Sequence, residues 1–212
     1  MAACEEYLQG RGARTLYVGA ISPLNPFYLG LYGGSELPGV VRTDQNWIQV
    51  IRDRGYTPAD TCLVFHCDLD RFKPPMDRQQ LMLKRGYKVT PVGLPQDETW
   101  WQACTAPPHE PMRFELTPLA GDTPTASLQY WLLDPICRGW GVLAAGLTKL
   151  SVSIPHRRQG MGTLLVAESL RQIRMSGVQL VEAQTMERNV AAIALYRKLG
   201  FQEVDQGIVF RK

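Results

Sequence analysis

The sequence predicts an α/β fold in which a mixed, mostly antiparallel sheet is flanked by helices. Over the last third of the chain, β-rich apolar runs alternate with stretches of helical periodicity. Upstream of these lie three short β-rich runs separated by Pro and Gly, which predict consecutive antiparallel strands. The chain of 212 residues is 45% hydrophobic, so it can bury a substantial core.

The C-terminal third begins with a predicted strand and helix. Residues 142–154, "VLAAGLTKLSVSI", are rich in β-forming side chains and predict a strand or a bent strand. The stretch 163–176 carries its apolar residues at helical spacing. Gly177 is well placed to end that helix.

A second strand and helix follow at once. Residues 178–185, "VQLVEAQT", predict a buried strand. The side chain of Asn189 can cap the next helix, which Gly200 ends. Residues 201–211 predict a final strand, so the order strand, helix, strand, helix, strand indicates a mixed sheet.

The chain is expected to divide at a Pro-rich segment. The three upstream strands are predicted at 113–119, 126–134 and 139–147. Because residues 96–111 are rich in Pro and turn-forming residues, they predict a linker. The expected domains are therefore 1–95, a smaller or partial α/β domain, and 112–212, the functional domain.

The N-terminal part resembles the C-terminal part in pattern. The segment "WIQVIRDRGY" at 47–56 matches "AIALYRKLGF" at 192–201, since each is an apolar helix end followed by Gly and an aromatic residue. Upstream, "CEEYLQGRGARTLYVGAI" resembles "SLRQIRMSGVQLVEAQT", but an insertion, "SPLNPFYLGLYGGSELPG", follows it. These matches favour a divergent internal repeat; the alternative is a coincidence of a common helix–Gly–strand pattern. One more helix and strand are expected in "PPMDRQQLMLKRGYKVTPVG".

Composition and charge narrow the class of protein. The net charge of +3 is too small to predict nucleic-acid binding. The five cysteines are scattered and form no CxxC pair, which favours free thiols in a reducing compartment. The opening "MAACEEYLQGRGA" lacks the apolar core of a secretory signal, and no apolar run approaches the ~20 residues that span a bilayer. We therefore expect a soluble, cytoplasmic protein that binds neither nucleic acid nor membrane.

The segment "SIPHRRQGMGTLLVAESL", residues 153–170, predicts a phosphate site. A helix N-terminus presents unpaired N–H groups and partial positive charge, and glycine lets ligand oxygens approach them. Arg157 and Arg158 add charge and bidentate donors. Together these features suit a phosphate or pyrophosphate group.

Three phosphate-binding motifs compete for this turn. The P-loop pattern GxxxxGK[ST] is absent, and GxGxxG fails because Leu165 stands where the third Gly belongs. The third pattern, [RQ]xxGxG/A, is met by residues 157–162, and it resembles the signature of the GCN5-related N-acetyltransferase (GNAT) superfamily. The following strand, Asn189, Tyr196 and "LGF" at 199–201 extend the resemblance. It departs from the family because "GDTPT" leaves room only for a turn where a helical pair is usual.

The resemblance implies an acetyl-CoA-dependent N-acetyltransferase that acetylates an amine by direct attack. It implies Tyr196 as the catalytic proton donor to the departing thiolate, and no metal. The implied acetyl-CoA-binding residues are Leu150, Ser151, Val152, Arg157, Arg158, Gln159, Gly160, Met161, Gly162, Thr163 and Asn189. The acceptor is expected to be a small-molecule or protein amine, and a homodimer is one option for the oligomeric state.

Several roles stay open at this stage. Glu182, Glu187 and Asp134 are candidate general bases, and water-mediated deprotonation is equally admissible. His66 and Cys67 in "FHCDLD" are of the types that bind metals, but no partner pair lies at zinc spacing. The alternative to an enzyme is a non-catalytic CoA-binding or protein-interaction module with a GNAT core.

Overall fold

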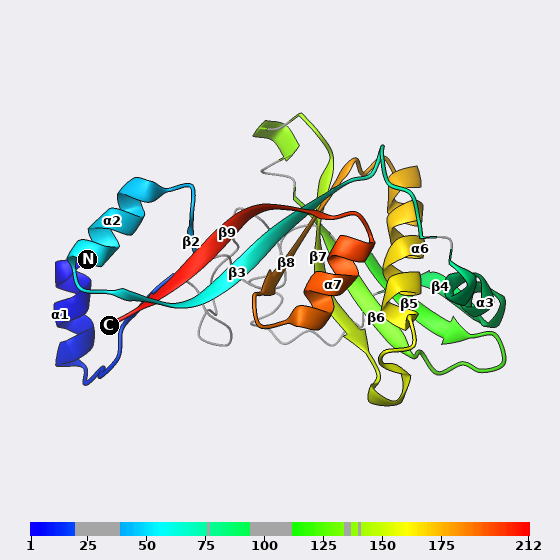
Figure 1. Cartoon of the computed structure of the whole chain (residues 1–212), viewed down its shortest axis with the longest axis horizontal. Helices are drawn as coiled ribbons and strands as arrows, with labels where there is room; N and C mark the ends of the chain where they lie inside the picture. The colour runs from blue at the N-terminus through cyan, green and yellow to red at the C-terminus, as the bar shows by residue number, and fades with distance from the viewer. Residues whose placement is uncertain (20–38, 76, 94–111, 134–136, 140) are drawn as a thin grey trace.

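The computed structural model describes residues 1–19, 39–75, 77–93, 112–133, 137–139 and 141–212. Their strands form one sheet in the order β1-β9-β3-β8-β7-β6-β5-β4, with β2 beside β9 (Figure 1). The β7–β8 pair is parallel, and the other pairs of described strands are antiparallel. The predicted mixed, mostly antiparallel α/β fold is confirmed.

The elements have the following bounds. The helices are α1 (Ala2–Gly10), α2 (Gln45–Asp53), α3 (Arg78–Gly86), α6 (Met161–Met175) and α7 (Val190–Lys198), with a 3₁₀ turn η1 at Ile154–His156. The strands are β1 (Tyr17–Val18), β2 (Val40–Val41), β3 (Thr57–Asp68), β4 (Tyr87–Val92), β5 (Met112–Pro118), β6 (Ala126–Leu132), β7 (Ala144–Val152), β8 (Leu180–Met186) and β9 (Gln202–Arg211).

Most predicted elements are present with small boundary shifts. The two strands predicted at 139–147 and 142–154 are the single strand β7, which begins after Gly141 turns the chain at a φ of 67°. None of the helices formed by the described residues is long and apolar enough to cross a membrane. Asp134, one of the candidate bases, lies outside the described residues.

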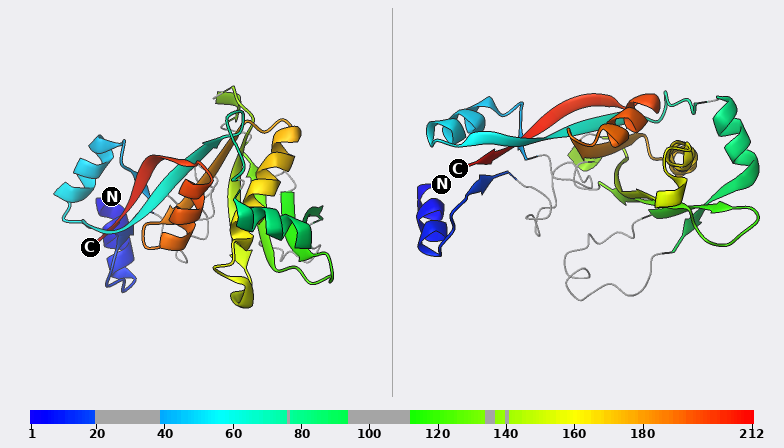
Figure 2. Two further views of the ribbon diagram at one scale, coloured as in Figure 1. Left: turned by 45° about the vertical axis from the view of Figure 1, so that its right-hand side comes forward. Right: turned by 60° about the horizontal axis from the view of Figure 1, so that its bottom comes forward.

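Helices α6 and α7 cover one face of the sheet. Side chains alternate along each strand, so Phe65 and Cys67 of β3 share this face with Val181 and Ala183 of β8. They join apolar residues of α6 and α7 in the larger core, which also takes Phe114 from β5. Figure 2 shows α3 and α6 at the end of the molecule opposite α1 and α2.

Strand β3 was not predicted from the sequence. It lies between β8 and β9, in register with both, and so occupies the middle of the sheet. Strand β4, also from the predicted first domain, pairs with β5. The division at 96–111 stays a prediction, but the described sheet and its larger core draw on residues from both sides of it.

Two helix–strand units within the chain match closely. Asp44 caps α2 by accepting the Trp47 N–H at 3.1 Å, and Asn189 caps α7 by accepting the Ala192 N–H at 3.2 Å. The strands that follow are β3 and β9, which pair antiparallel and run side by side through Figure 1. Between helix and strand, the glycines of both units have the same φ of 81°.

The strand pairing repeats as well. Met186 of β8 pairs with Cys62 of β3, and at the equivalent position Val41 of β2 pairs with Gly207 of β9. Strands β1 and β2 together therefore take the place that β8 holds in the other unit. This shared register is the arrangement that an internal repeat predicts, and the repeat itself stays a prediction.

Candidate functional site

Strands β7 and β8 separate in the middle of the sheet. They are parallel neighbours from the pair Ala144–Leu180 to the pair Leu147–Ala183. Beyond that point β8 continues beside β3, whereas β7 continues beside β6. The far edge of residues 148–152 therefore has no strand partner among the described residues, and an extended ligand can pair with it, although the Val152 carbonyl already accepts from the Arg157 side chain. Three predicted binding residues, Leu150, Ser151 and Val152, lie along this edge.

A bulge in β7 accompanies the separation. The register with β6 shifts between Ser127 and Gln129, and Lys149 has a left-handed φ of 50°. An extra residue of this kind bends a strand and disrupts pairing locally, so it turns the end of β7 away from β8.

The helix that follows β7 begins without a side-chain cap. Its N-cap is Gly160, which has a left-handed φ of 83° and offers no side-chain acceptor. By contrast, Asp44, Asp77 and Asn189 cap α2, α3 and α7 through their side chains. The first amides of α6 are therefore not used by a cap, and they meet the requirement of an anion site at a helix N-terminus. Three predicted binding residues, Met161, Gly162 and Thr163, carry these amides.

The arginine-containing turn is exposed and held by its own side chains. Arg157 Nε donates to the Val152 carbonyl at 3.0 Å, and Gln159 Nε2 donates to the Pro155 carbonyl at 2.8 Å. Arg158 has a left-handed φ of 63° and is exposed. The guanidinium groups therefore add positive charge beside the uncapped helix end.

Helix α3 holds the opposite side of this turn. Gln80 Nε2 donates to the Gly160 carbonyl at 3.3 Å, and Gln79 Nε2 donates to the Gln159 carbonyl at 3.2 Å. Lys198 of α7 binds Asp77, the cap of α3, at 2.9 Å. Nothing in the local sequence around 79–80 predicted this contact, because it joins residues far apart in the chain.

Replacing Gln80 with leucine is expected to weaken binding of acetyl-CoA, the ligand that the sequence resemblance implies, about fivefold, the equivalent of one neutral hydrogen bond. Gln80 is 2% exposed, so leucine keeps the packing but removes the side-chain donor to the Gly160 carbonyl, which keeps only the Leu164 N–H at 3.0 Å. Calorimetric titration with acetyl-CoA measures the effect. Leu81→Ala on the same helix, an exposed side chain, is the control. An unchanged affinity in the Gln80 variant would contradict the role of α3.

Tyr196 lies in α7 on the same face of the sheet as α6. It is 3% exposed, and its ring centroid lies 5.6 Å from that of Phe65 and 5.3 Å from that of Phe201. Phe65 pairs with Ala183, which belongs to the last parallel pair before β7 and β8 separate. The predicted proton donor is thus buried next to the point of separation. Asn189 caps α7, as expected, and its ligand contact stays a prediction.

The match to known proteins agrees with this geometry. Residues 91–201, more than half of the chain, match the acetyltransferase (GNAT) family. The chain belongs to the GNAT family. The chain is 40% identical over 60 residues to N-acetyltransferase family 8 member 3 of Rattus norvegicus, covering 28% of this chain and 26% of that protein. An uncharacterized N-acetyltransferase of Bacillus subtilis, YobR, is 31% identical over 61 residues, covering 29% of this chain and 25% of that one.

Solved GNAT structures share the fold of the chain. A tandem GNAT protein from the clavulanic acid biosynthesis pathway superposes with a TM-score of 0.63 and 17% identity, covering 100% of this chain and 67% of that one. A GNAT from Sphaerobacter thermophilus gives a TM-score of 0.62 and 15% identity, with 98% and 64% covered. The chain spans about a quarter of the length of the curated relatives that it matches.

On the other face of this GNAT sheet lies a buried acid. Glu182 of β8 is 0% exposed and pairs in register with His66 of β3. Glu182 Oε2 lies 3.0 Å from His66 Nε2, and Glu182 Oε1 accepts from Gln184 Nε2 at 2.9 Å. Burial raises the pKa of Glu182 to about 7, although the bonds from His66 and Gln184 oppose that shift. Glu187, another candidate base, is exposed beyond the end of β8.

The buried acid predicts a pH dependence of stability. The pKa of Glu182 is about 7 in the folded protein and 4.5 in its ordinary state, so the folded chain holds this proton more tightly. Its contribution is complete below pH 4.5 and is lost as the pH rises to 7. Over this pH range the wild-type protein should lose free energy of unfolding on the order of 3 kcal/mol through this group, and the Glu182→Gln variant should not show that loss. Urea unfolding at a series of pH values tests this, and parallel curves for wild type and variant would contradict it.

His66 and Cys67 do not form one metal site in this GNAT chain. They are neighbours in β3, so their side chains point to opposite faces of the sheet. Burial, with a smaller effect from Asp68, raises the pKa of Cys67 to about 12, which makes it a poor ligand or nucleophile. Within the described ranges, no three His, Cys, Asp or Glu side chains gather as a metal would require.

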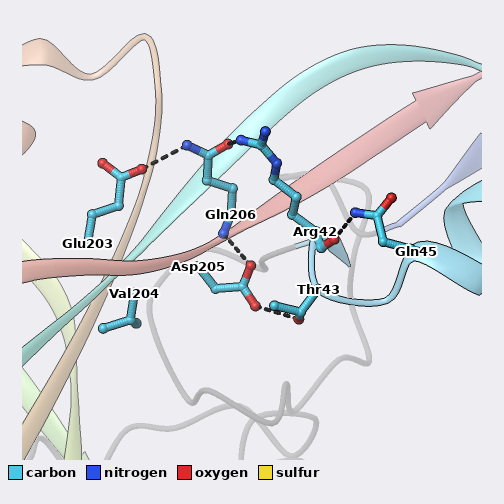
Figure 3. A pocket seen from close by; sticks show the side chains of 7 residues that line it. All are labelled: Arg42, Thr43, Gln45, Glu203, Val204, Asp205 and Gln206. Atoms are coloured by element: carbon cyan, nitrogen blue, oxygen red, sulfur yellow. Dashed lines mark hydrogen bonds between the residues drawn. The ribbon is translucent and has the colours of Figure 1, made fainter.

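A surface hollow lies apart from the uncapped N-terminus of α6. It has a volume of about 420 Å³ and is lined by residues of the β2–α2 segment and of β9 (Figure 3). Its side chains bind one another: Arg42 donates to Gln206 at 3.1 Å, and Thr43 donates to Asp205 at 2.8 Å. These bonds join the two repeated units, so the hollow is part of their contact.

Proposed function

We propose that the chain is an acetyl-CoA-dependent N-acetyltransferase that moves an acetyl group to an amine by direct attack. The observation that carries this proposal is the separation of β7 and β8 beside the uncapped N-terminus of α6. The two features suit the two parts of one ligand, because an extended amide-containing arm needs a free strand edge and a diphosphate needs unpaired N–H groups.

Each predicted residue has a role in this proposal. The amides of Met161, Gly162 and Thr163 would bind the diphosphate, with charge added by Arg157 and Arg158. The free edge of β7 from 148 to 152 would pair with the arm of the coenzyme. Acetyl-CoA supplies an activated acyl group, and Tyr196 would give a proton to the departing sulfur.

A second candidate function is a non-catalytic CoA-binding module. The burial of Tyr196 between two aromatic rings favours it, since a phenol packed in the core needs no catalytic role. The two candidates share the coenzyme site and differ in turnover.

The test has two stages. Calorimetric titration with acetyl-CoA should give saturable heat, with NAD and ATP as comparison ligands. Release of free thiol is then followed in the presence of a panel of amines: amino acids, polyamines, aminoglycosides and lysine peptides. Binding with amine-dependent thiol release supports the enzyme, whereas binding without release supports the module. Absence of heat with acetyl-CoA overturns both.

A further inference from the structure

One face of the sheet carries buried polar side chains that the proposed coenzyme site does not use. They lie on four neighbouring strands around the point where β7 and β8 separate, on the face away from α6 and α7. They are Gln129 of β6, Thr148 of β7, Glu182 and Gln184 of β8, and His66 of β3. Glu182 is 0% exposed, Gln184 1%, Thr148 2% and Gln129 8%. Burial of such groups is costly unless they are paired.

Two of these groups are not satisfied. The side-chain oxygens of Gln129 and Gln184 are buried and have no hydrogen-bond partner among the described residues. Glu182 bonds to His66 and accepts from Gln184, and its carboxyl oxygens add further acceptors to the same face. A site with several acceptors and unused lone pairs fits a ligand that donates hydrogen bonds, and an amine or ammonium ion is such a ligand.

The matching helix–strand unit shows that the sheet forms without a buried acid–histidine pair at the corresponding place. The position equivalent to His66 in the other unit is Arg211, and the position equivalent to Glu182 is Tyr17. Tyr17 and Arg211 are partners in register, as His66 and Glu182 are. Unlike Glu182, however, Tyr17 and Arg211 are exposed. Of these two equivalent positions in the sheet, only the one beside the separated strands β7 and β8 carries a buried acid paired with a histidine.

We propose that this polar face binds the acyl acceptor, that His66 takes the proton from the attacking amine, and that Glu182 is its positioning partner. The inference rests on the proposed acetyl transfer. The side chain of His66 is 21% exposed and that of Glu182 is 0% exposed, so an incoming amine meets the histidine first. Phe65, the residue before His66, contacts Tyr196, so the proton acceptor and the proton donor flank the separation point from opposite faces.

The proton balance of the step is complete. His66 takes one proton from the ammonium ion and passes it to solvent. The neutral amine then attacks the thioester carbon, so a C–N bond forms and the C–S bond breaks. The second amine proton goes to His66 while Tyr196 protonates the sulfur, and exchange with solvent restores both side chains. The products are an amide, a thiol and one released proton.

The described groups around the pair are few. Facing Glu182, β3 contributes His66, β8 contributes Gln184, and β7 contributes Gly146, which carries no side chain. On its other side His66 is in register with Gln202 of β9. Asp68 of β3 lies on the same face two residues from His66, and its side chain, 50% exposed, forms an ion pair with Arg71.

The first experiment tests the pair without any turnover. Proton NMR of the wild-type protein should show a His66 Nε2–H resonance shifted far downfield by its bond to the carboxylate. His66→Gln should remove the resonance, and Glu182→Gln should move it upfield. A resonance that Glu182→Gln leaves in place overturns the pairing, whether or not the protein binds acetyl-CoA.

The second experiment uses the amine that turns over fastest in the panel. His66→Gln and His66→Ala should each lower kcat about 100-fold and remove the acidic limb of the pH profile. Added imidazole should restore turnover in His66→Ala but not in His66→Gln. Gln184→Met should raise KM for the amine about fivefold without changing acetyl-CoA affinity. Arg211→Ala, at the equivalent position of the repeat, is the matched control.

The outcomes separate this inference from the proposed function. Failure to bind acetyl-CoA removes the function, while the NMR result still stands. Normal turnover with an unchanged pH profile in both His66 variants overturns the inference and leaves the function intact. Acetyl-CoA binding without turnover on any amine overturns the acceptor site.

Discussion

Tyr196→Phe is expected to lower kcat about 100-fold while leaving the fold and the affinity for acetyl-CoA intact. The substitution removes only the phenolic oxygen, which is the group proposed to protonate the departing sulfur. Phenylalanine keeps the ring contacts with Phe65 at 5.6 Å and Phe201 at 5.3 Å. The change should therefore appear mainly in turnover, and its effect on the free energy of unfolding should be much smaller than that of removing the ring.

Tyr196→Ala provides the contrast. Removing a buried aromatic side chain from the core should lower the free energy of unfolding by about 3–5 kcal/mol. Tyr56→Phe is the control for loss of a phenol elsewhere, because Tyr56 is buried in the smaller core beside α2. Steady-state thiol release and urea unfolding measure both effects. A Tyr196→Phe variant with wild-type kcat would exclude the phenol from the reaction and favour a packing role.

Gly160→Ala is expected to weaken acetyl-CoA binding at least about tenfold and to lower the free energy of unfolding by about 1–2 kcal/mol. Gly160 has a left-handed φ of 83°, so any L side chain is strained there. A Cβ would also stand 2.9 Å from Gln80 Nε2 and 3.2 Å from Leu83 Cδ1. The Gln80 side chain, helix α3 or the turn must then move, and the turn carries the amides proposed to bind the diphosphate.

Gly177→Ala is the control that separates the effect of backbone strain from the effect of a change at the proposed binding turn. Gly177 follows the C-terminus of the same helix with a φ of 92°, but the nearest atom to an added Cβ is Leu143 Cδ2 at 3.8 Å. Both variants should lose similar stability, and only Gly160→Ala should lose affinity in calorimetry. Equal affinities in the two variants would remove the Gly160 turn from the coenzyme site.

Local features of the fold were predictable from the sequence. The cap at Asn189, the glycine ends of the helices and the Gly160 turn depend on dihedral angles and hydrogen bonds within a few residues. The repeat was visible for the same reason, since each unit carries its own cap and glycine. The run 62–67, "CLVFHC", carries a strand signal that is short and β-rich, and such a run does not by itself reveal its place in the sheet.

The candidate site was predictable only in part. The residues proposed to bind the coenzyme are almost contiguous in the chain, so a motif reveals them. His66 and Glu182 are 116 residues apart, and their pairing depends on β3 entering the sheet beside β8. The same holds for the hydrogen bond from Gln80 of α3 to the Gly160 carbonyl.

By itself, the sequence determined the order of elements from 142 to 211, their caps and the helix N-terminus that resembles a phosphate site. The tertiary structure alone decided where β3 lies, which acid meets His66 and how deeply Tyr196 is buried. The physical reason is the range of the interactions. Caps and turns form between near neighbours, whereas strand order, register and burial follow from packing the whole sheet against its helices.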